Sequence, residues 1–320
     1  MKHAAVPLVV KSFAKLNLYL QVLNKRKDGF HNLNTLFARI DLADTIIFKK
    51  RKDSLIKFKC NNQQVPEDET NLCYRAAALL KQKFNVNSGV GIELKKCIPV
   101  GAGLGGGSAN AASVLLGLNK LWKLNLPKTN LINLGAKLGS DVPFFIHQVK
   151  FALGSQRGDK IKPLASLNKL KLWFILIYPE FKVSTPLIYQ KFDACFSANS
   201  SFSQLTPISI GKKVTKKQLV WGLTRPQCNV KILTSELSKK GKVSNVAHLF
   251  NSLEIITSNL YPVVNQVKNA LSDIGLDKVM MSGSGPSVFA ICDSFRQAQS
   301  LRNKLRKQYK TWQIFVVSTV

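Results

Sequence analysis

The chain has 320 residues, 45% of them hydrophobic, which is enough to bury a sizeable core in one large domain or two ordinary ones. Its formal net charge of +30 would attract nucleic acid, anionic membrane surfaces or acidic small molecules, but the lysines are spread over the whole chain, as a general preference for lysine would also produce. No run reaches the roughly 18 apolar residues of a membrane span, so we expect no membrane-spanning helix.

The first residues and the cysteines indicate the compartment. The stretch MKHAAVPLVVKSF is too short and too weakly hydrophobic for a convincing signal peptide. The six cysteines are scattered without a C-x-x-C pair, which favours buried free thiols over disulfides or a metal site. We therefore expect a cytoplasmic protein, and the sequence names no protein ligand for a metal.

The first predicted strand, over residues 14–22, contains the motif AKLNLYL. Its alternation places Lys15 and Asn17 on one face, two residues apart. Lys15 could extend to solvent, or it could pair with a carboxylate and hold it ionised. Further strands are predicted up to Phe48 and over 54–60 and 89–97, with a helix over 71–84.

The stretch PVGAGLGGGSANAAS (residues 99–113) holds five glycines in seven residues and then becomes a predicted helix from Ser108. Glycine is costly in folded elements, by roughly 0.5–1 kcal/mol relative to alanine, whereas bare N–H groups at a helix N-terminus bind phosphate. A dinucleotide fingerprint would need an acidic residue about 20 positions later, and a P-loop would need a following Gly-Lys-Ser/Thr. Both features are missing. Two interpretations of the stretch therefore remain, a loop that binds phosphate and a flexible turn that binds no ligand. Ser108 is interpreted as the N-cap residue, with or without a hydroxyl directed at phosphate or Mg²⁺.

A second helix is predicted over 128–139, closed by Gly139, and the motif GSDVPFF follows. Asp141 precedes a Val-Pro pair, which is a standard helix start with Asp as N-cap. The alternative is a carboxylate that accepts a proton from a substrate hydroxyl.

After residue 150 the predicted strands and helices follow one another in a less regular order. Strands are predicted over 151–164 and 169–179, and the polar stretch 190–245 carries short helices at best. Helices over 246–257 and 261–275 are followed by strand–turn–strand over 278–293, a helix over 294–310 and a closing strand over 311–320. The turn SGSGPS (282–287) is either a plain hairpin turn or a second element that positions phosphates. The irregular mixture favours an α+β fold, divided into residues 1–155 and 156–320.

These motifs, in this order, resemble those of a known superfamily. PVGAGLGGGSANAA resembles the phosphate loop of the galactokinase, homoserine kinase, mevalonate kinase and phosphomevalonate kinase superfamily, and MSGSGPSVFA resembles its C-terminal glycine motif. AKLNLYL, KDGFHNLNTLF, GSDVPFF and FNSLE are similar to one family within it, the 4-diphosphocytidyl-2-C-methyl-D-erythritol kinases. The similarity runs from about Ser12 to Cys292.

The resemblance implies a two-domain small-molecule kinase fold, with a ribosomal-protein-like N-terminal domain that binds nucleotide and an α/β-sandwich C-terminal domain that completes the substrate cleft. It implies transfer of the γ-phosphoryl group of ATP, with Mg²⁺, to the 2-hydroxyl of the cytidyl sugar alcohol, in non-mevalonate isoprenoid biosynthesis. By motif, Asp141 matches the catalytic base and Lys15 its partner. The residues matched to ATP binding are Pro99, Gly101, Gly103, Leu104, Gly105, Gly106, Gly107, Ser108 and Ala109.

The same resemblance implies a site for the cytosine ring. Phe30 and Tyr189 would sandwich the base and His31 would hydrogen-bond to it. Such stacking is worth ~1–3 kcal/mol per base. Core packing is the alternative role for the two aromatic residues. The other residues matched to substrate binding are Asn17, Thr185, Gly283, Ser284 and Gly285.

Some positions depart from the family pattern. Leu153 stands where an acid is common, Ser252 where Asp is usual, and the 196–245 region is longer and more basic. These departures leave room for a different substrate within the superfamily. A basic nucleic-acid-binding protein is the alternative from another class, although RNA binding would not require Lys15, Asp141 and both glycine motifs together. The sequence does not indicate the oligomeric state.

Overall fold

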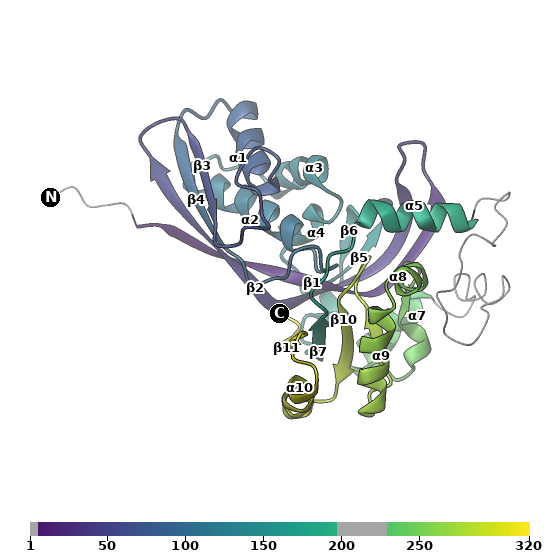
Figure 1. The fold of residues 1–320 in the computed structure, drawn as a ribbon. Coiled ribbons are helices and arrows are strands. Elements are labelled where there is room, and N and C mark those ends of the chain that lie inside the picture. The colour runs from purple at the N-terminus through teal and green to yellow at the C-terminus, as the bar shows by residue number, and fades with distance from the viewer. Residues whose placement is uncertain (1–5, 197–228) are drawn as a thin grey trace.

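Two sheets, each covered by helices on its outer side, form the molecule (Figure 1). The computed structural model describes residues 6–196 and 229–320. Within these residues, no helix is long and apolar enough to cross a membrane. Strands and helices are mixed without regular alternation, so the predicted α+β class is confirmed.

The first sheet has seven strands in the order β3-β4-β2-β1-β8, with β5 beside β2 and β6 beside β5. The long antiparallel hairpin of β1 and β2 forms its centre. The strands are β1 (Leu8–Lys25), β2 (His31–Arg51), β3 (Ile56–Cys60), β4 (Gly89–Lys95), β5 (Phe151–Ser155), β6 (Lys160–Pro163) and β8 (Phe250–Asn251). The helices packed on it are α1 (Leu72–Lys83), α2 (Gly106–Leu121), α3 (Lys128–Leu138) and α4 (Val142–His147).

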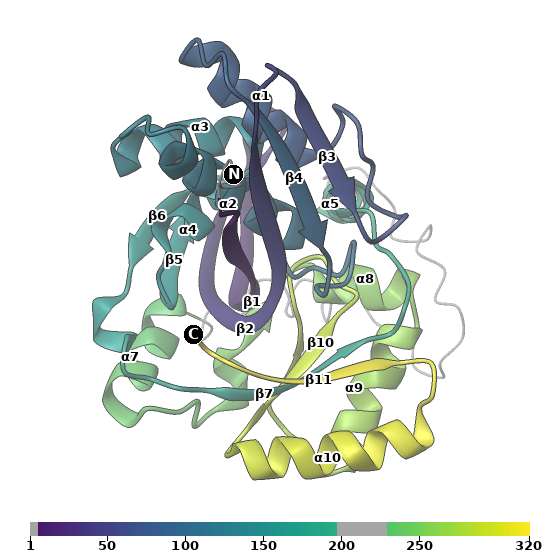
Figure 2. The ribbon, with the colours of Figure 1, turned by 90° about the vertical axis from the view of Figure 1, so that its left-hand side faces the viewer.

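The second sheet has four strands in the order β11-β7-β10-β9, and its outer face is covered by helices (Figure 2). The strands are β7 (Trp173–Tyr178), β9 (Val279–Met281), β10 (Val288–Cys292) and β11 (Gln313–Ser318). The helices of this half are α5 (Thr185–Phe196), α7 (Val230–Lys240), α8 (Glu254–Leu260), α9 (Val263–Asp273) and α10 (Phe295–Gln308), with short 3-10 turns at Ala165–Leu167 and Val246–His248.

The two sheets share a core. Leu16 and Leu18 of β1 belong to the same buried cluster as Phe174 and Phe289 of the second sheet. Since side chains alternate along a strand, Lys15 and Asn17 point away from this cluster and line a cavity instead. The hydrophobic alternation of β1 therefore places two polar side chains at the functional site.

Most of the predicted elements are confirmed, including the β9–β10 hairpin and the position of Gly139 at the end of α3. The predicted helix over 246–257 is wrong in its first half, which forms a 3-10 turn and the short strand β8 before α8 starts at Glu254. Two side chains explain this difference. Asn251 donates to the carbonyl oxygens of Met281 and Gly283, and the hydroxyl of Ser252 accepts from the backbone N–H of Val22. Tertiary hydrogen bonds thus outweigh the helical pattern.

The polar stretch predicted over 190–245 lies partly outside the described residues, which resume at 229. The predicted division after residue 155 falls in the turn of the β5–β6 hairpin, and the chain passes from the first sheet to the second between β6 and β7. The division into domains stays a prediction.

Candidate active site

Both glycine motifs meet at one place, although they are far apart in sequence. Gly103 has φ +76°, and a Cβ there would lie 2.2 Å from the carbonyl oxygen of Ser282. The Ser282 hydroxyl donates to the carbonyl oxygen of Gly103 at 3.1 Å. Only glycine fits this left-handed backbone and close approach. The β9–β10 turn is therefore more than a hairpin connection, because it supports the 99–108 loop.

The loop ends at the N-terminus of α2. Gly105, with φ +69°, is the N-cap residue, and the backbone N–H of Ala109 is bonded to its carbonyl oxygen. The interpretation of Ser108 as N-cap is therefore wrong, because the left-handed Gly105 lets the helix start earlier. The N–H groups of Gly106, Gly107 and Ser108 come before the first intrahelical bond, and no acidic residue lies in this first turn. The free N–H groups and the positive end of the helix dipole attract an anion.

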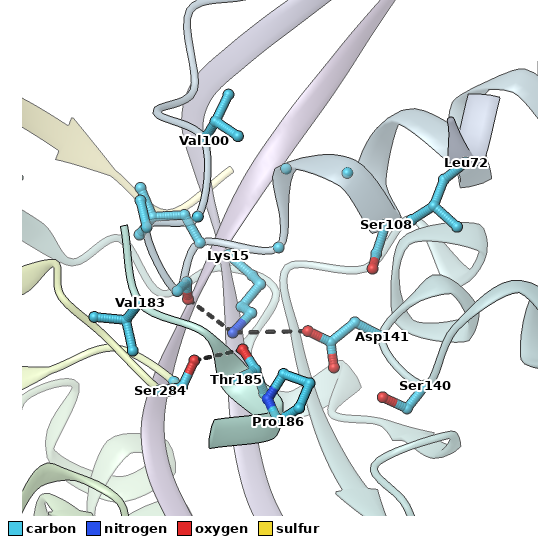
Figure 3. A pocket seen from close by; sticks show the side chains of 18 of the residues that line it. Lys15, Leu72, Val100, Ser108, Ser140, Asp141, Val183, Thr185, Pro186 and Ser284 are labelled. Carbon is cyan, nitrogen blue, oxygen red and sulfur yellow. Dashed lines mark hydrogen bonds and ion pairs between the residues drawn. The ribbon is translucent and has the colours of Figure 1, made fainter. Parts of the chain in front are cut away.

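Lys15 and Asp141 face each other across the cavity (Figure 3). Lys15 Nζ lies 3.8 Å from Asp141 Oδ2 and donates to Asn17 Oδ1 at 2.5 Å and to the carbonyl oxygen of Gly103 at 3.0 Å. Asp141 is the N-cap residue of α4, but its backbone is in the αR region and its side chain accepts no capping bond. The carboxylate instead points into the cavity (Figure 3).

The environments of this pair differ. The side chain of Lys15 is 5% exposed and that of Asp141 is 29% exposed. Burial lowers the pKa of the Lys15 ammonium from its usual value, and the nearby Asp141 carboxylate opposes this shift. Asp141 and two oxygen acceptors surround the buried ammonium group, and the Asp141 carboxylate beside it stays partly exposed.

A cavity of about 950 Å³ joins these groups. Every predicted site residue lines it except Ala109 and Gly285. Ala109 is buried in the core of the first sheet, and its backbone N–H is used within the helix. A Cβ on Gly285 (φ +84°) would lie 2.5 Å from Met281 Sδ, so this glycine shapes the turn. Their predicted contacts with ATP and substrate stay predictions.

Helix α5 lines the cavity with Thr185 and Tyr189. The hydroxyl groups of Thr185 and Ser284 are hydrogen-bonded at 2.7 Å, which ties α5 to the β9–β10 turn (Figure 3). One helical turn later, the ring of Tyr189 stacks on His31, with centroids 5.2 Å apart at 26°. Phe30 is 51% exposed, and the Arg157 guanidinium lies 5.1 Å from its ring centroid. The three residues predicted to hold a base thus line one end of the cavity.

Sequence reasoning missed two parts of the site. Lys96 pairs with the fully buried Asp44, approaches Asn110 of α2 and lines the same cavity. Asp193 accepts from His31 at the other end of the cavity. Lys96 carries no local signal, because its partner comes from another strand. Asp193 follows Tyr189 by four residues, and this helical spacing could have placed both on one face.

The chain matches two family models, GHMP kinases N terminal domain over residues 71–148 and GHMP kinases C terminal over residues 233–311. It is 38% identical over 299 residues to a 4-diphosphocytidyl-2-C-methyl-D-erythritol kinase of Bacillus pumilus, covering 93% of each chain. It is 36% identical over 301 residues to the enzyme of the same name from Bacillus subtilis, again covering 93% of both. The chain belongs to this kinase family.

Solved structures agree. A crystal structure of a 4-(cytidine 5'-diphospho)-2C-methyl-D-erythritol kinase superposes with a TM-score of 0.69 at 30% identity, covering 98% of this chain and all of the other. A homoserine kinase from Cytophaga hutchinsonii superposes with a TM-score of 0.60 at 20% identity over 98% of this chain and 94% of the other, which shows the shared fold alone. The protein is an ATP-dependent kinase, as its membership in the 4-diphosphocytidyl-2-C-methyl-D-erythritol kinase family requires.

Proposed function

We propose that this protein transfers the γ-phosphoryl group of ATP to the 2-hydroxyl of 4-diphosphocytidyl-2-C-methyl-D-erythritol, in isoprenoid precursor biosynthesis. The observation that carries the proposal is the Lys15–Asp141 pair, which lies in one cavity with a phosphate-binding helix end and a base-binding wall. Family membership supplies the substrate.

Asp141 acts as the base. Its partly exposed carboxylate accepts the proton of the attacking hydroxyl. Lys15 holds this carboxylate in position through their ion pair, and its positive charge stabilises the negative charge of the phosphoryl group as it passes from ATP to the hydroxyl. Phosphoryl transfer requires chiefly alignment and stabilisation of negative charge, so a short acid, a buried cation and bare N–H groups suffice.

The ATP phosphates lie along residues 99–108. The N–H groups of Gly106, Gly107 and Ser108 donate to phosphate oxygens, as helix N-termini do for anions. The aliphatic part of the Lys182 side chain packs against Gly101, where an added Cβ would lie 3.1 Å from its Cγ. The loop can therefore hold a triphosphate without a P-loop lysine.

Mg²⁺ fits the site as a partner of ATP. Within residues 6–196 and 229–320, no group of three or more His, Cys, Asp or Glu side chains could hold a metal by itself. Mg²⁺ usually keeps several waters and binds one or two carboxylates together with substrate phosphates. The Ser108 hydroxyl lines the cavity beside the helix end and is the protein group that would reach the ion (Figure 3). When bound, the ion would neutralise part of the negative charge of the ATP phosphates.

The cytidyl group occupies the end of the cavity near Phe30 and Tyr189. Phe30 is 51% exposed and lines the cavity, so its ring is accessible to a ligand there. Tyr189 supplies the opposite aromatic surface, and base stacking is worth ~1–3 kcal/mol. A kinase for homoserine or mevalonate would have no base to place there.

A coupled ADP-release assay tests the function. Mg-ATP is offered with 4-diphosphocytidyl-2-C-methyl-D-erythritol, the free sugar alcohol, homoserine or mevalonate. We expect turnover with the cytidyl compound alone. Turnover with another alcohol instead would contradict the substrate while leaving the kinase chemistry intact, and absence of turnover with all four would contradict both.

A further inference from the structure

The side chain of His31 lies in a socket formed by Tyr189, Phe192 and Asp193 of α5. Its side chain is 4% exposed. Tyr189 stacks on one face of the ring, the Phe192 ring meets its edge at 83°, and Asp193 Oδ1 lies 2.7 Å from Nε2. Three residues of one helix thus fix both the plane and the rotation of this imidazole.

The carboxylate of Asp193 is itself fixed. Its second oxygen, Oδ2, accepts a hydrogen bond from Lys25 Nζ at 2.5 Å, at the end of β1. Oδ1 is therefore the oxygen turned to His31. Asp193 joins α5 to both strands of the β1–β2 hairpin at the base-binding end of the cavity.

The partner of Nε2 decides the tautomer of the ring. An ionised carboxylate only accepts hydrogen bonds, so Nε2 carries the hydrogen. In neutral imidazole the other nitrogen is then a bare acceptor. Nδ1 makes no hydrogen bond to any of the described residues, and His31 lines the cavity. The socket therefore presents a fixed acceptor to the ligand.

We propose that Asp193 is a positioning residue for base selection: by holding His31 with hydrogen on Nε2, it makes Nδ1 an acceptor for the exocyclic amino group of cytosine. The inference rests on the proposed function. Uracil carries a carbonyl oxygen at the same position of its ring, so it would place acceptor against acceptor. A site built to bond a donor rejects the analogue that lacks it, because its own buried polar group is left unpaired.

Steady-state kinetics with the cytidyl substrate and its uridyl analogue test the proposal. In the wild type at pH 8.5, we expect kcat/KM to favour the cytidyl compound by about 100-fold or more. Asp193→Ala should lower this preference at least tenfold through KM of the cytidyl substrate, with kcat and the KM of ATP little changed. Asp193→Asn can offer an N–H to Nε2 and so permit hydrogen on Nδ1, and should reduce the preference further. Lys191→Ala, an exposed change on the same helix, is the matched control and should keep the preference.

A spectroscopic measurement separates tautomer control from a structural role. Long-range ¹H–¹⁵N correlation of His31 should show hydrogen on Nε2 in the wild type and in Lys191→Ala, and a mixture of tautomers in Asp193→Ala. An unchanged preference in both Asp193 variants, or hydrogen on Nδ1 in the wild type, would overturn the proposal. Equal wild-type turnover of the cytidyl and uridyl compounds would also overturn it while the kinase function stands. A wild type inactive on the cytidyl compound would instead contradict the proposed function itself.

Discussion

Lys15 Nζ lies 3.8 Å from Asp141 Oδ2, and this contact joins the central strand of the first sheet to the start of α4. The same ammonium group donates to the carbonyl oxygen of Gly103, so one buried lysine contacts both Asp141 and the 99–108 loop. The motifs at residues 15, 103 and 141 therefore meet at one place.

Replacing Lys15 by methionine keeps the length of the side chain and removes its charge. We expect kcat to fall by ~10²–10³, as for the loss of one preorganised charge-stabilising donor. Circular dichroism and thermal unfolding should show a folded protein, because methionine fills the same space. Lys50→Met, at an exposed position, is the control. Wild-type kcat in Lys15→Met would show that this lysine does not serve the reaction.

The pH dependence should report the same group. Burial lowers the pKa of Lys15 below its usual 10.5, so rising pH removes its proton earlier than from an exposed lysine. We expect kcat/KM to decline on the alkaline side with an apparent pKa below 10.5. Between this lowered pKa and 10.5, the unfolded chain binds more protons at Lys15 than the folded chain does. The contribution of Lys15 to the free energy of unfolding therefore increases with pH in that range. A profile that stays flat up to pH 10.5 would contradict this assignment.

Gly103→Ala should prevent the close backbone contact between the two glycine motifs. Its Cβ would lie 2.2 Å from the Ser282 carbonyl oxygen, which is backbone and cannot move cheaply. Gly275 has φ +87° with nothing within 4 Å of a Cβ, so Gly275→Ala measures the left-handed strain alone, about 1–2 kcal/mol. We expect Gly103→Ala to destabilise the protein more than Gly275→Ala in urea unfolding and to weaken ATP binding, which Gly275→Ala should preserve. Equal losses of stability in the two variants would argue against the close approach.

Phe30→Ala tests the aromatic wall without disturbing the core, since this ring is 51% exposed. We expect KM for the cytidyl substrate to rise about 10- to 100-fold, which corresponds to ~1–3 kcal/mol of stacking, and KM for ATP to stay unchanged. Phe295 is 49% exposed and lies against Trp173, away from the cavity residues, so Phe295→Ala is the matched control. An equal change in the KM of both substrates would contradict a role for Phe30 in base binding.

The parts of the site that the sequence predicts have local signals. Alternation in β1 places Lys15 and Asn17 together, and the two glycine clusters mark backbone that must approach other backbone. The start of α2 could not be placed from the sequence, because serine is preferred over glycine as an N-cap residue and Ser108 is the candidate. In the structure, Gly105 takes the N-cap position with a left-handed backbone. The Asp193–His31 contact and the strand β8 depend on partners distant in sequence, which no local pattern contains.

The measurement that tests the account most directly is single-turnover phosphoryl transfer by Asp141→Asn with Mg-ATP and 4-diphosphocytidyl-2-C-methyl-D-erythritol. Asp277→Asn, whose side chain is 74% exposed, is the control and should react like the wild type. Asparagine keeps the shape of Asp141 but cannot accept the proton, so we expect the rate of transfer to fall by ~10²–10⁴ with ATP affinity little changed. Transfer at the wild-type rate in Asp141→Asn would remove this carboxylate from the mechanism and contradict the account.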